Sequence, residues 1–137
     1  MPIVVDASVA LKWVIEEDGS LAARQLILRE TLAAPDFLAT ECASVLWAKA
    51  RRNQIPSSDA RAGLAAILAA PVQMLRSAQF VAAAQSIAFD LDQTVYDSLY
   101  LAAAVAQRAV LVTADAAFAV AAEGHALYAM SVRLLQA

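Results

Sequence analysis

Short apolar runs alternate along this chain with longer segments of helical periodicity, and this alternation constrains the fold more than any other feature. The runs expected to form strands are Ile3–Val5, Val72–Leu75, Val110–Thr113 and Leu127–Met130, with Ala33–Ala34 as a weaker fifth. The segments expected to form helices are Ser8–Ile15, Leu21–Glu30, Asp36–Asn53, Ser58–Leu68, Gln79–Leu91, Asp97–Gln107 and Asp115–Ala122. Because strands that alternate with helices form crossover units, the pattern predicts an α/β fold with a parallel sheet covered on both faces.

No linker, repeat or long charge run divides the 137 residues, so we expect a single domain, 1–137. A hydrophobic content of 61% excludes a disordered chain, and one cysteine and one histidine exclude an internal disulfide and a Cys- or His-rich metal site. Asp97 and Asp115 interrupt the most apolar stretches, and Asp6 closely follows a start without basic residues. We therefore expect neither a membrane-spanning helix nor a signal peptide, and a cytoplasmic location.

The net charge of −3 argues against a dedicated binder of duplex nucleic acid, which usually has a basic face. It does not exclude an enzyme that holds nucleic acid through metal ions, because those cations are not counted in the sequence.

Four carboxylates lie at or near the places where a parallel sheet binds its ligands, beyond the carboxyl ends of the strands. Asp6 follows the first strand, and Asp115 follows Val110–Thr113 by two residues. Glu41 and Asp97 lie on apolar faces of their helices, where a carboxylate is costly to bury unless it is paired or bound to a metal.

Each carboxylate also has a plainer interpretation. Asp6 and Asp115 can cap the helices that follow them, and Thr94–Asp97 has the spacing of a capping box. Together, however, the four predict one acidic pocket in which like charges raise one another's pKa. A divalent cation with oxygen ligands, Mg²⁺ or Mn²⁺, would relieve that repulsion, and such sites commonly serve phosphoryl chemistry.

The chain contains four ordered blocks of sequence: Val4–Trp13, Ala34–Leu38 followed by Glu41, Val95–Ala104 and Leu111–Asp115. In this order they resemble the blocks of PIN-domain proteins, in particular the VapC-like toxin ribonucleases of bacterial toxin–antitoxin pairs. The resemblance implies a PIN-like three-layer α/β/α fold, with a short central parallel sheet of four or five strands and about seven helices. It also implies a metal-dependent endoribonuclease that leaves 5′-phosphate and 3′-hydroxyl ends.

Carried over by position, the resemblance gives catalytic roles to Asp6, Glu41, Asp97 and Asp115, with Asp6 and Asp97 as the metal ligands. Supporting positions are Ser8, Thr113 and Ser44; Ser44 stands where the family often has asparagine. The implied partners are RNA, a second copy of the chain, and an antitoxin. The antitoxin would lay apolar side chains near Trp13 and offer a basic side chain to the acidic site.

Some alternatives stay open at this stage. The basic cluster Lys49, Arg51 and Arg52 either suits the negative end of a helix or contacts RNA phosphate. The chain as a whole could instead be a PIN-domain RNA-processing nuclease outside toxin–antitoxin pairs, or a non-catalytic binding module whose acids only cap helices. A phosphoacceptor domain is disfavoured, because no lysine follows Lys49.

Overall fold

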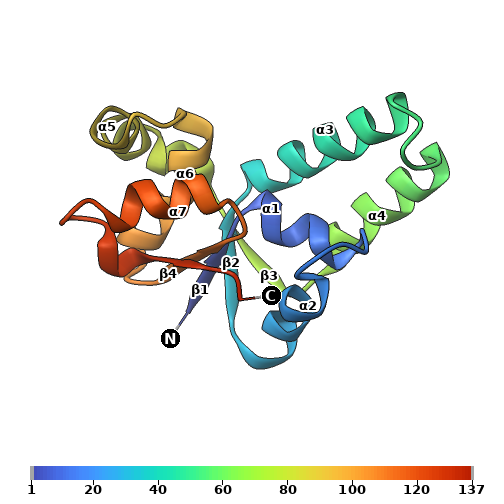
Figure 1. The fold of residues 1–137 in the computed structure, drawn as a ribbon, viewed down its shortest axis with the longest axis horizontal. Coiled ribbons are helices and arrows are strands. Elements are labelled where there is room, and N and C mark those ends of the chain that lie inside the picture. Colours follow the sequence, from blue (N-terminus) through green and yellow to red (C-terminus); the bar gives the residue numbers. More distant parts are fainter. Residues whose placement is uncertain (1, 137) are drawn as a thin grey trace.

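In the computed structural model, which describes residues 2–136, five strands form one parallel sheet in the order β3-β2-β1-β4-β5 (Figure 1). The strands are β1 (Ile3–Val5), β2 (Leu32–Pro35), β3 (Val72–Leu75), β4 (Val110–Thr113) and β5 (Val132–Leu134). The central strand β1 pairs Ile3 with Leu32 of β2 on one side and with Val110 of β4 on the other. Because all neighbours are parallel, the carboxyl ends of all five strands lie at one edge of the sheet.

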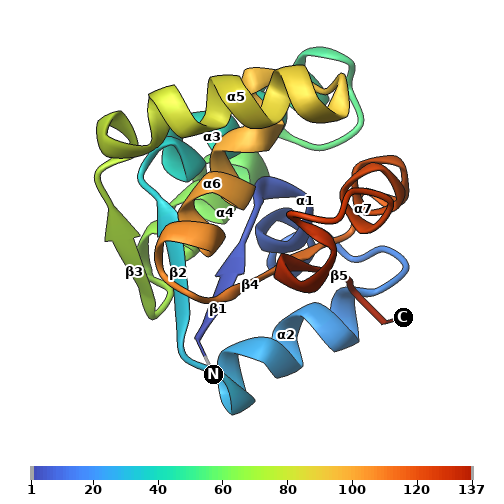
Figure 2. The ribbon, with the colours of Figure 1, turned by 90° about the vertical axis from the view of Figure 1, so that its left-hand side faces the viewer.

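Seven α-helices connect these strands within residues 2–136. They are α1 (Ala7–Ala10), α2 (Ser20–Arg29), α3 (Phe37–Arg51), α4 (Ser57–Ala69), α5 (Val81–Leu91), α6 (Val95–Ala106) and α7 (Ala116–Glu123). Short 3₁₀ turns add η1 (Leu11–Trp13), η2 (Ser77–Phe80) and η3 (Ala129–Ser131). The expected three-layer α/β/α architecture is confirmed: α5 and α6 lie on one face of the sheet and α1 and α2 on the other, while α3 and α4 form an arm beyond them (Figures 1 and 2).

The core lies between the sheet and α6. Every residue of β1 is buried, and on α6 Leu101 and the three alanines that follow it are buried too. These small side chains allow α6 to pack directly on β1, β2 and β4. The close packing fixes the N-terminal end of α6, which carries Asp97, near the carboxyl edge of the sheet.

The structure confirms Ile3–Val5, Val72–Leu75 and Val110–Thr113 as strands with the expected bounds, and it extends Ala33–Ala34 to Leu32–Pro35. The helix expected over Ser8–Ile15 is instead the short α1 followed by η1.

The strand predicted at Leu127–Met130 is wrong, because the chain turns there and the last strand follows at Val132–Leu134. Tyr128 explains the difference: its hydroxyl donates to Asp90 Oδ2 of α5 at 2.6 Å, and backbone bonds close turns on both sides of it. Leu127 and Met130, whose apolar side chains suggested burial, are 71% and 89% exposed.

Among the helices that the structure describes, none is both long enough and apolar enough to cross a membrane.

Candidate active site

Asp6 lies directly after β1, and donors from two different segments fix its carboxylate. The Ser8 hydroxyl donates to Oδ1 at 2.5 Å, and the backbone N–H of Val9 donates to the same oxygen at 3.2 Å. The Thr113 hydroxyl, at the end of β4, donates to Oδ2 at 2.5 Å. The carboxylate therefore joins the ends of β1 and β4, and its orientation is set before any ligand binds.

Ser8 and Thr113 are themselves held by the backbone that follows β4. The N–H of Ala114 donates to Ser8 Oγ at 2.8 Å, and the N–H of Asp115 donates to Thr113 Oγ1 at 3.1 Å. Thr113 is completely buried. The two hydroxyls that sequence analysis marked as supporting thus orient Asp6, and they are occupied in doing so.

Glu41 lies in the second turn of α3, and its carboxylate is held from the neighbouring α6. The Tyr100 hydroxyl donates to Glu41 Oε1 at 2.5 Å. Tyr100 is buried, and a buried tyrosine hydroxyl requires a partner. Tyr100 was not among the site residues expected from the sequence; the signal for it is a hydroxyl on the otherwise apolar face of its helix.

Asp97 and Asp115 lie at the starts of α6 and α7. The side chain of Thr94 caps α6 by accepting from the Asp97 N–H at 3.1 Å, while Asp115 caps α7 by accepting from the Phe118 N–H at 3.1 Å through Oδ1. The capping interpretation is therefore correct for Asp115, and also for Asp6, which accepts from Val9. For α6 the cap is Thr94, and the structure gives the Asp97 carboxylate no cap bond among residues 2–136.

These four acids line one hollow of about 250 Å³ at the carboxyl edge of the sheet. Ala7, Ser8, Leu11 and Val45 complete its lining, so no lysine or arginine is among the lining residues. The carboxylates come from four separate places in the fold, which is the convergence that the positions of the strand ends predicted.

The hollow disfavours negative charge. Burial raises the pKa of Asp6 above its ordinary value despite the hydrogen bonds from Ser8 and Thr113, and the nearby charge of Asp97 raises it further. Burial also raises the pKa of Glu41 and of Asp97, and each has a further upward contribution from a neighbouring carboxylate. Ionising this cluster therefore costs folding free energy unless a cation compensates it.

The donor set fits a hard divalent cation, because every polar side chain that lines the hollow ends in a carboxylate or a hydroxyl. Within residues 2–136, however, no three carboxylate, histidine or cysteine side chains are arranged to hold one ion together. A cation such as Mg²⁺ can bind through one or two carboxylates and keep several waters.

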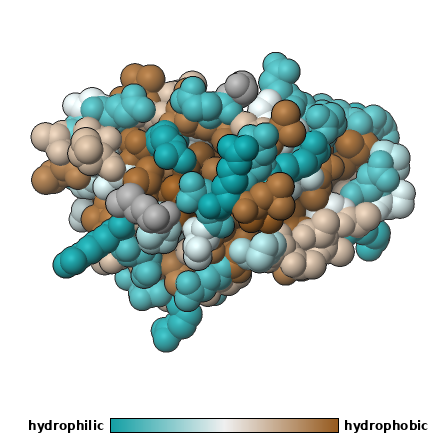
Figure 3. All heavy atoms as spheres, turned by 90° about the horizontal axis from the view of Figure 1, so that it is seen from below, coloured by the Kyte–Doolittle hydropathy of each residue, from teal (hydrophilic) through white to brown (hydrophobic). Residues whose placement is uncertain are grey.

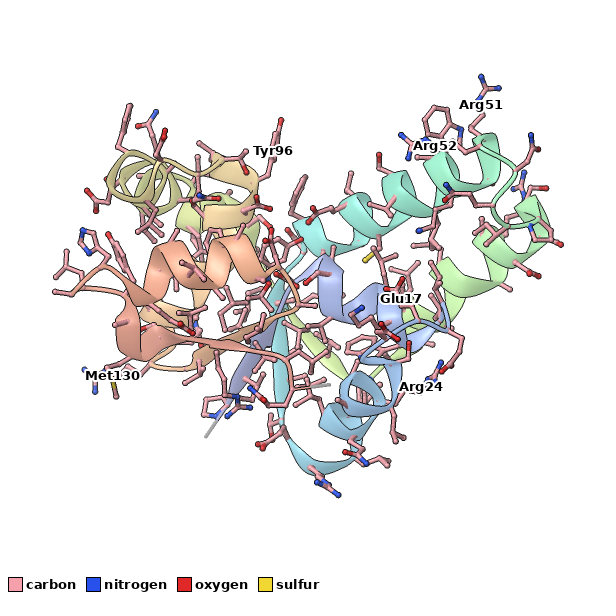
Figure 4. All side chains as sticks on the ribbon, viewed as in Figure 1. Glu17, Arg24, Arg51, Arg52, Tyr96 and Met130 are labelled. Carbon is pink, nitrogen blue, oxygen red and sulfur yellow. The ribbon has the colours of Figure 1, made fainter. Side chains whose placement is uncertain are left out.

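The other residues selected from the sequence lie outside this hollow. Ser44 is exposed on α3 and lines an adjoining hollow. Lys49, Arg51 and Arg52 lie at the far end of α3, where Figure 4 shows both arginines pointing away from the body of the molecule. The Arg51 guanidinium lies 5.8 Å from the centre of the Trp47 ring, so it is engaged in a cation–π contact there.

Known proteins resemble this chain both in sequence and in fold. The PIN domain family matches residues 3–124. The chain is 36% identical over 113 residues to Ribonuclease VapC9 of Mycobacterium tuberculosis and to VapC ribonuclease Mb0985 of Mycobacterium bovis, covering 82% of this chain and 85% of each relative.

Two solved structures share the fold. PAE2754 from Pyrobaculum aerophilum superposes with a TM-score of 0.73 at 24% identity, covering 90% of this chain and 81% of that one. VapC20 of Mycobacterium tuberculosis, a toxin that cleaves the sarcin-ricin loop, superposes with a TM-score of 0.67 at 17% identity, covering 87% and 94%.

Proposed function

The chain belongs to the PIN-domain family and, within it, to the VapC ribonucleases, and on that premise we propose that it is a metal-dependent endoribonuclease that hydrolyses RNA phosphodiester bonds. Its biological role is that of the toxin in a toxin–antitoxin pair. The observation that carries the proposal is the convergence of four carboxylates on one hollow whose lining holds no basic side chain.

Asp6 and Asp97 are the residues that would hold Mg²⁺ or Mn²⁺, since both carboxylates line the hollow and each lies close enough to other acids for its pKa to be raised by them. Such a cation supplies Lewis-acid chemistry: it stabilises the negative charge that develops on the phosphate and makes water more acidic. Its positive charge also removes the repulsion that the four acids exert on one another.

The side chains of this protein then orient the reactants and move the proton. Ser8 and Thr113 fix the plane of the Asp6 carboxylate. Tyr100 engages Glu41 Oε1, which leaves Oε2 to accept a proton from the attacking water. Because burial raises its pKa, Glu41 is a stronger base than an ordinary glutamate. Attack of water on phosphorus breaks the bond to the 3′ oxygen, which takes up a proton from solvent, and this leaves a 5′-phosphate and a 3′-hydroxyl.

The test is cleavage of a panel of defined single-stranded and hairpin RNAs in Mg²⁺, in Mn²⁺ and in EDTA. Wild type and Asp18→Asn, a matched loss of an exposed carboxylate outside the hollow, should cleave in metal and not in EDTA. Asp6→Asn should cleave at least ~10²-fold more slowly. Cleavage that persists in EDTA, or an absence of cleavage of every RNA in both metals, would overturn the proposal.

The antitoxin, on this proposal, occupies a hollow of about 650 Å³ that begins directly after Trp13. Val14 and Ile15 line one side of it, and Ile55 and the exposed Ala62 of α4 line the other. Apolar side chains of a partner segment would fill it, and a basic side chain of the same partner would reach the acidic hollow. Ala62→Arg should abolish co-purification with the product of an adjacent small gene while nuclease activity persists; an intact complex contradicts this placement.

A homodimer is the proposed state of the free toxin, because large apolar side chains remain at the surface. Leu28 and Met130 are each more than 80% exposed, and Figure 3 shows apolar patches among polar ones on the face seen from below. Light scattering at micromolar concentration should give twice the chain mass, and a monomer would refute this state.

A further inference from the structure

A second hollow, of about 460 Å³, adjoins the acidic one and has no role in the chemistry described above. The two hollows share Glu41, Val45 and Asp97 in their linings. A ligand in the second hollow therefore lies directly beside the carboxylates that would act on a phosphate in the first. The two hollows are therefore placed to receive neighbouring groups of one substrate.

An aromatic pair forms one wall of this second hollow. The rings of Phe37, at the start of α3, and Tyr96, at the start of α6, are stacked with centroids 5.4 Å apart and an interplanar angle of 16°. Phe37 is partly buried against the core, so it gives the pair a fixed base. Tyr96 is 64% exposed and extends outward from the start of α6 (Figure 4).

This arrangement leaves ring surface of Tyr96 open to the solvent beside the proposed catalytic centre. Phe37 covers part of the Tyr96 ring, and Tyr96 makes no side-chain hydrogen bond to residues 2–136 that would explain its position. Tyr96 and Asp97 both line the second hollow, so a group stacked on the ring lies in the same hollow as a proposed metal ligand.

The other side chains of the hollow suit the edges of a nucleobase. Thr40, Ser44 and Thr94 line it with hydroxyls, each of which can donate or accept a hydrogen bond. No lysine or arginine lines either hollow, and the chain carries a net charge of −3. Basic side chains therefore contribute little affinity for backbone phosphates here, which leaves a larger share of the affinity to a cation held by the acids and to contacts with bases. Stacking of one base on an aromatic side chain supplies a substantial part of such affinity.

We propose that Tyr96, supported by Phe37, is the platform on which one unpaired nucleobase stacks, next to the phosphodiester bond that is cleaved. This inference rests on the proposed ribonuclease function and deepens it by naming how the substrate is held. Bases inside an A-form duplex have no free face, so the platform selects single strands and loops. Phe37 is a positioning residue that keeps the Tyr96 ring in place.

The experiment compares Tyr96→Ala, Tyr96→Phe and Tyr96→Leu with wild type. Phe89→Ala is the matched control, because Phe89 is 82% exposed on α5 and lines neither hollow. The substrate is a single-stranded RNA that wild type cleaves, together with versions that carry one abasic nucleotide on either side of the cleaved bond. The readouts are kcat and KM, and the anisotropy of the fluorescently labelled RNA in Mn²⁺.

Tyr96→Ala should raise KM and the dissociation constant about 10-fold, within the range for the loss of one base–aromatic stack, with kcat changed much less. Tyr96→Phe should behave like wild type because it keeps the ring, and Tyr96→Leu, which keeps an apolar contact with Phe37 but has no ring, should behave like Tyr96→Ala. One abasic position should weaken binding to wild type by about the same factor and cause no further loss in Tyr96→Ala, as expected for two partners of one contact.

Equal KM and binding in wild type, Tyr96→Ala and Tyr96→Leu would overturn the inference, as would losses confined to kcat. Phe89→Ala variants with the same loss would overturn it as well, because the effect would then not depend on the hollow. Failure of the proposed function has a different signature, namely wild type that cleaves no RNA in Mn²⁺. In that case the anisotropy decides: binding that depends on Tyr96 supports the platform, and binding that does not depend on it overturns the platform.

Discussion

Replacing Asp6 with asparagine separates the contribution of this side chain to folding from its contribution to chemistry. The Asp6 carboxylate accepts three hydrogen bonds, from the Ser8 and Thr113 hydroxyls and from the Val9 N–H. The amide oxygen of asparagine can accept the two bonds at Oδ1, and its NH₂ group can donate to Thr113 Oγ1 once that hydroxyl rotates. The substitution therefore keeps the shape and the bonds, and it removes one negative charge.

Two opposing effects determine the stability of this variant without metal. Hydrogen bonds to a charged group are worth about 1.5–3 kcal/mol and those between neutral groups about 0.5–1.5 kcal/mol, so loss of the charge weakens each of the three bonds by about 1 kcal/mol. Burial and the neighbouring charge of Asp97 act in the opposite direction. The pKa of Asp6 is raised in spite of its three hydrogen bonds, so the cost of charge exceeds their benefit. Asp6→Asn should thus be at least as stable as wild type in EDTA.

Asp6→Ala provides the contrast, because it removes the hydrogen-bonding group as well as the charge. Loss of the cap of α1 costs about 1 kcal/mol. The buried Thr113 hydroxyl loses its acceptor, which costs about 1–3 kcal/mol more. The sum of about 2–4 kcal/mol is the loss relative to Asp6→Asn, which lacks the charge too, and it corresponds to a Tm about 6–16 °C below that of Asp6→Asn for a domain of this size.

Urea denaturation in EDTA measures these stabilities, and initial cleavage rates in Mn²⁺ measure the chemistry. Asp6→Asn should be at least as stable as wild type and more stable than Asp6→Ala, while both variants cleave at least ~10²-fold more slowly than wild type. If Asp6 were only a cap, Asp6→Asn would match wild type in both assays, since asparagine is an equally good cap. An Asp6→Asn protein with full activity refutes the placement of the active site, and one destabilised by more than about 1 kcal/mol refutes the electrostatic balance.

Further expected outcomes concern the same cluster. Millimolar Mn²⁺ should raise the Tm of wild type and not that of Asp97→Asn, because a ligand that binds only the folded state stabilises it; no shift in wild type in a thermal melt contradicts the metal site. Tyr100→Phe removes the hydrogen bond that holds down the pKa of Glu41, so the acidic limb of the pH–rate profile should move to higher pH, whereas an unmoved limb excludes Glu41 as the base. In EDTA, the raised pKa values of Asp6, Glu41 and Asp97 should make the free energy of unfolding larger near pH 4–5 than at pH 7. The contribution of these groups to stability is full below the ordinary carboxyl pKa and is lost as pH rises through the raised values. Urea titrations at several pH values measure this dependence, and Asp6→Asn should make it flatter.

Three strands, Ile3–Val5, Val72–Leu75 and Val110–Thr113, could be predicted from the sequence, and the last strand could not. Ile3–Val5 and residues 110–112 are apolar because both faces of the sheet are covered at these central strands. The last strand, Val132–Leu134, lies at the edge, where Val132 is buried and Arg133 is exposed. A charged residue in a three-residue strand makes it look less apolar than the preceding Leu127–Met130, which forms a turn. Burial of Tyr128 against α5, which local composition does not encode, decides between the two segments.

The four carboxylates could be predicted because each has a local signal, namely a strand end or an apolar helix face; their catalytic roles stay predictions. The contact from Tyr100 to Glu41 and the stacking of Phe37 on Tyr96 could not be predicted. Both join α3 to α6, and each pair is 59 residues apart in the chain. The relative position of these helices follows from how each packs on the sheet, and no pattern within either helix specifies it.

The chemistry of Asp6 argues that its charge serves something other than folding. As a cap, an aspartate gains nothing over an asparagine, and here it carries a charge that burial disfavours. The protein nonetheless holds that carboxylate with two hydroxyls and a backbone N–H, which stabilise the charged form in one fixed orientation. Ionising Asp6 costs folding free energy, yet three donors stabilise its ionised form. This combination fits a site that binds a positively charged ligand. Functional sites commonly lower the stability of the fold in this way, because binding or catalysis requires side chains that packing and electrostatics alone would disfavour.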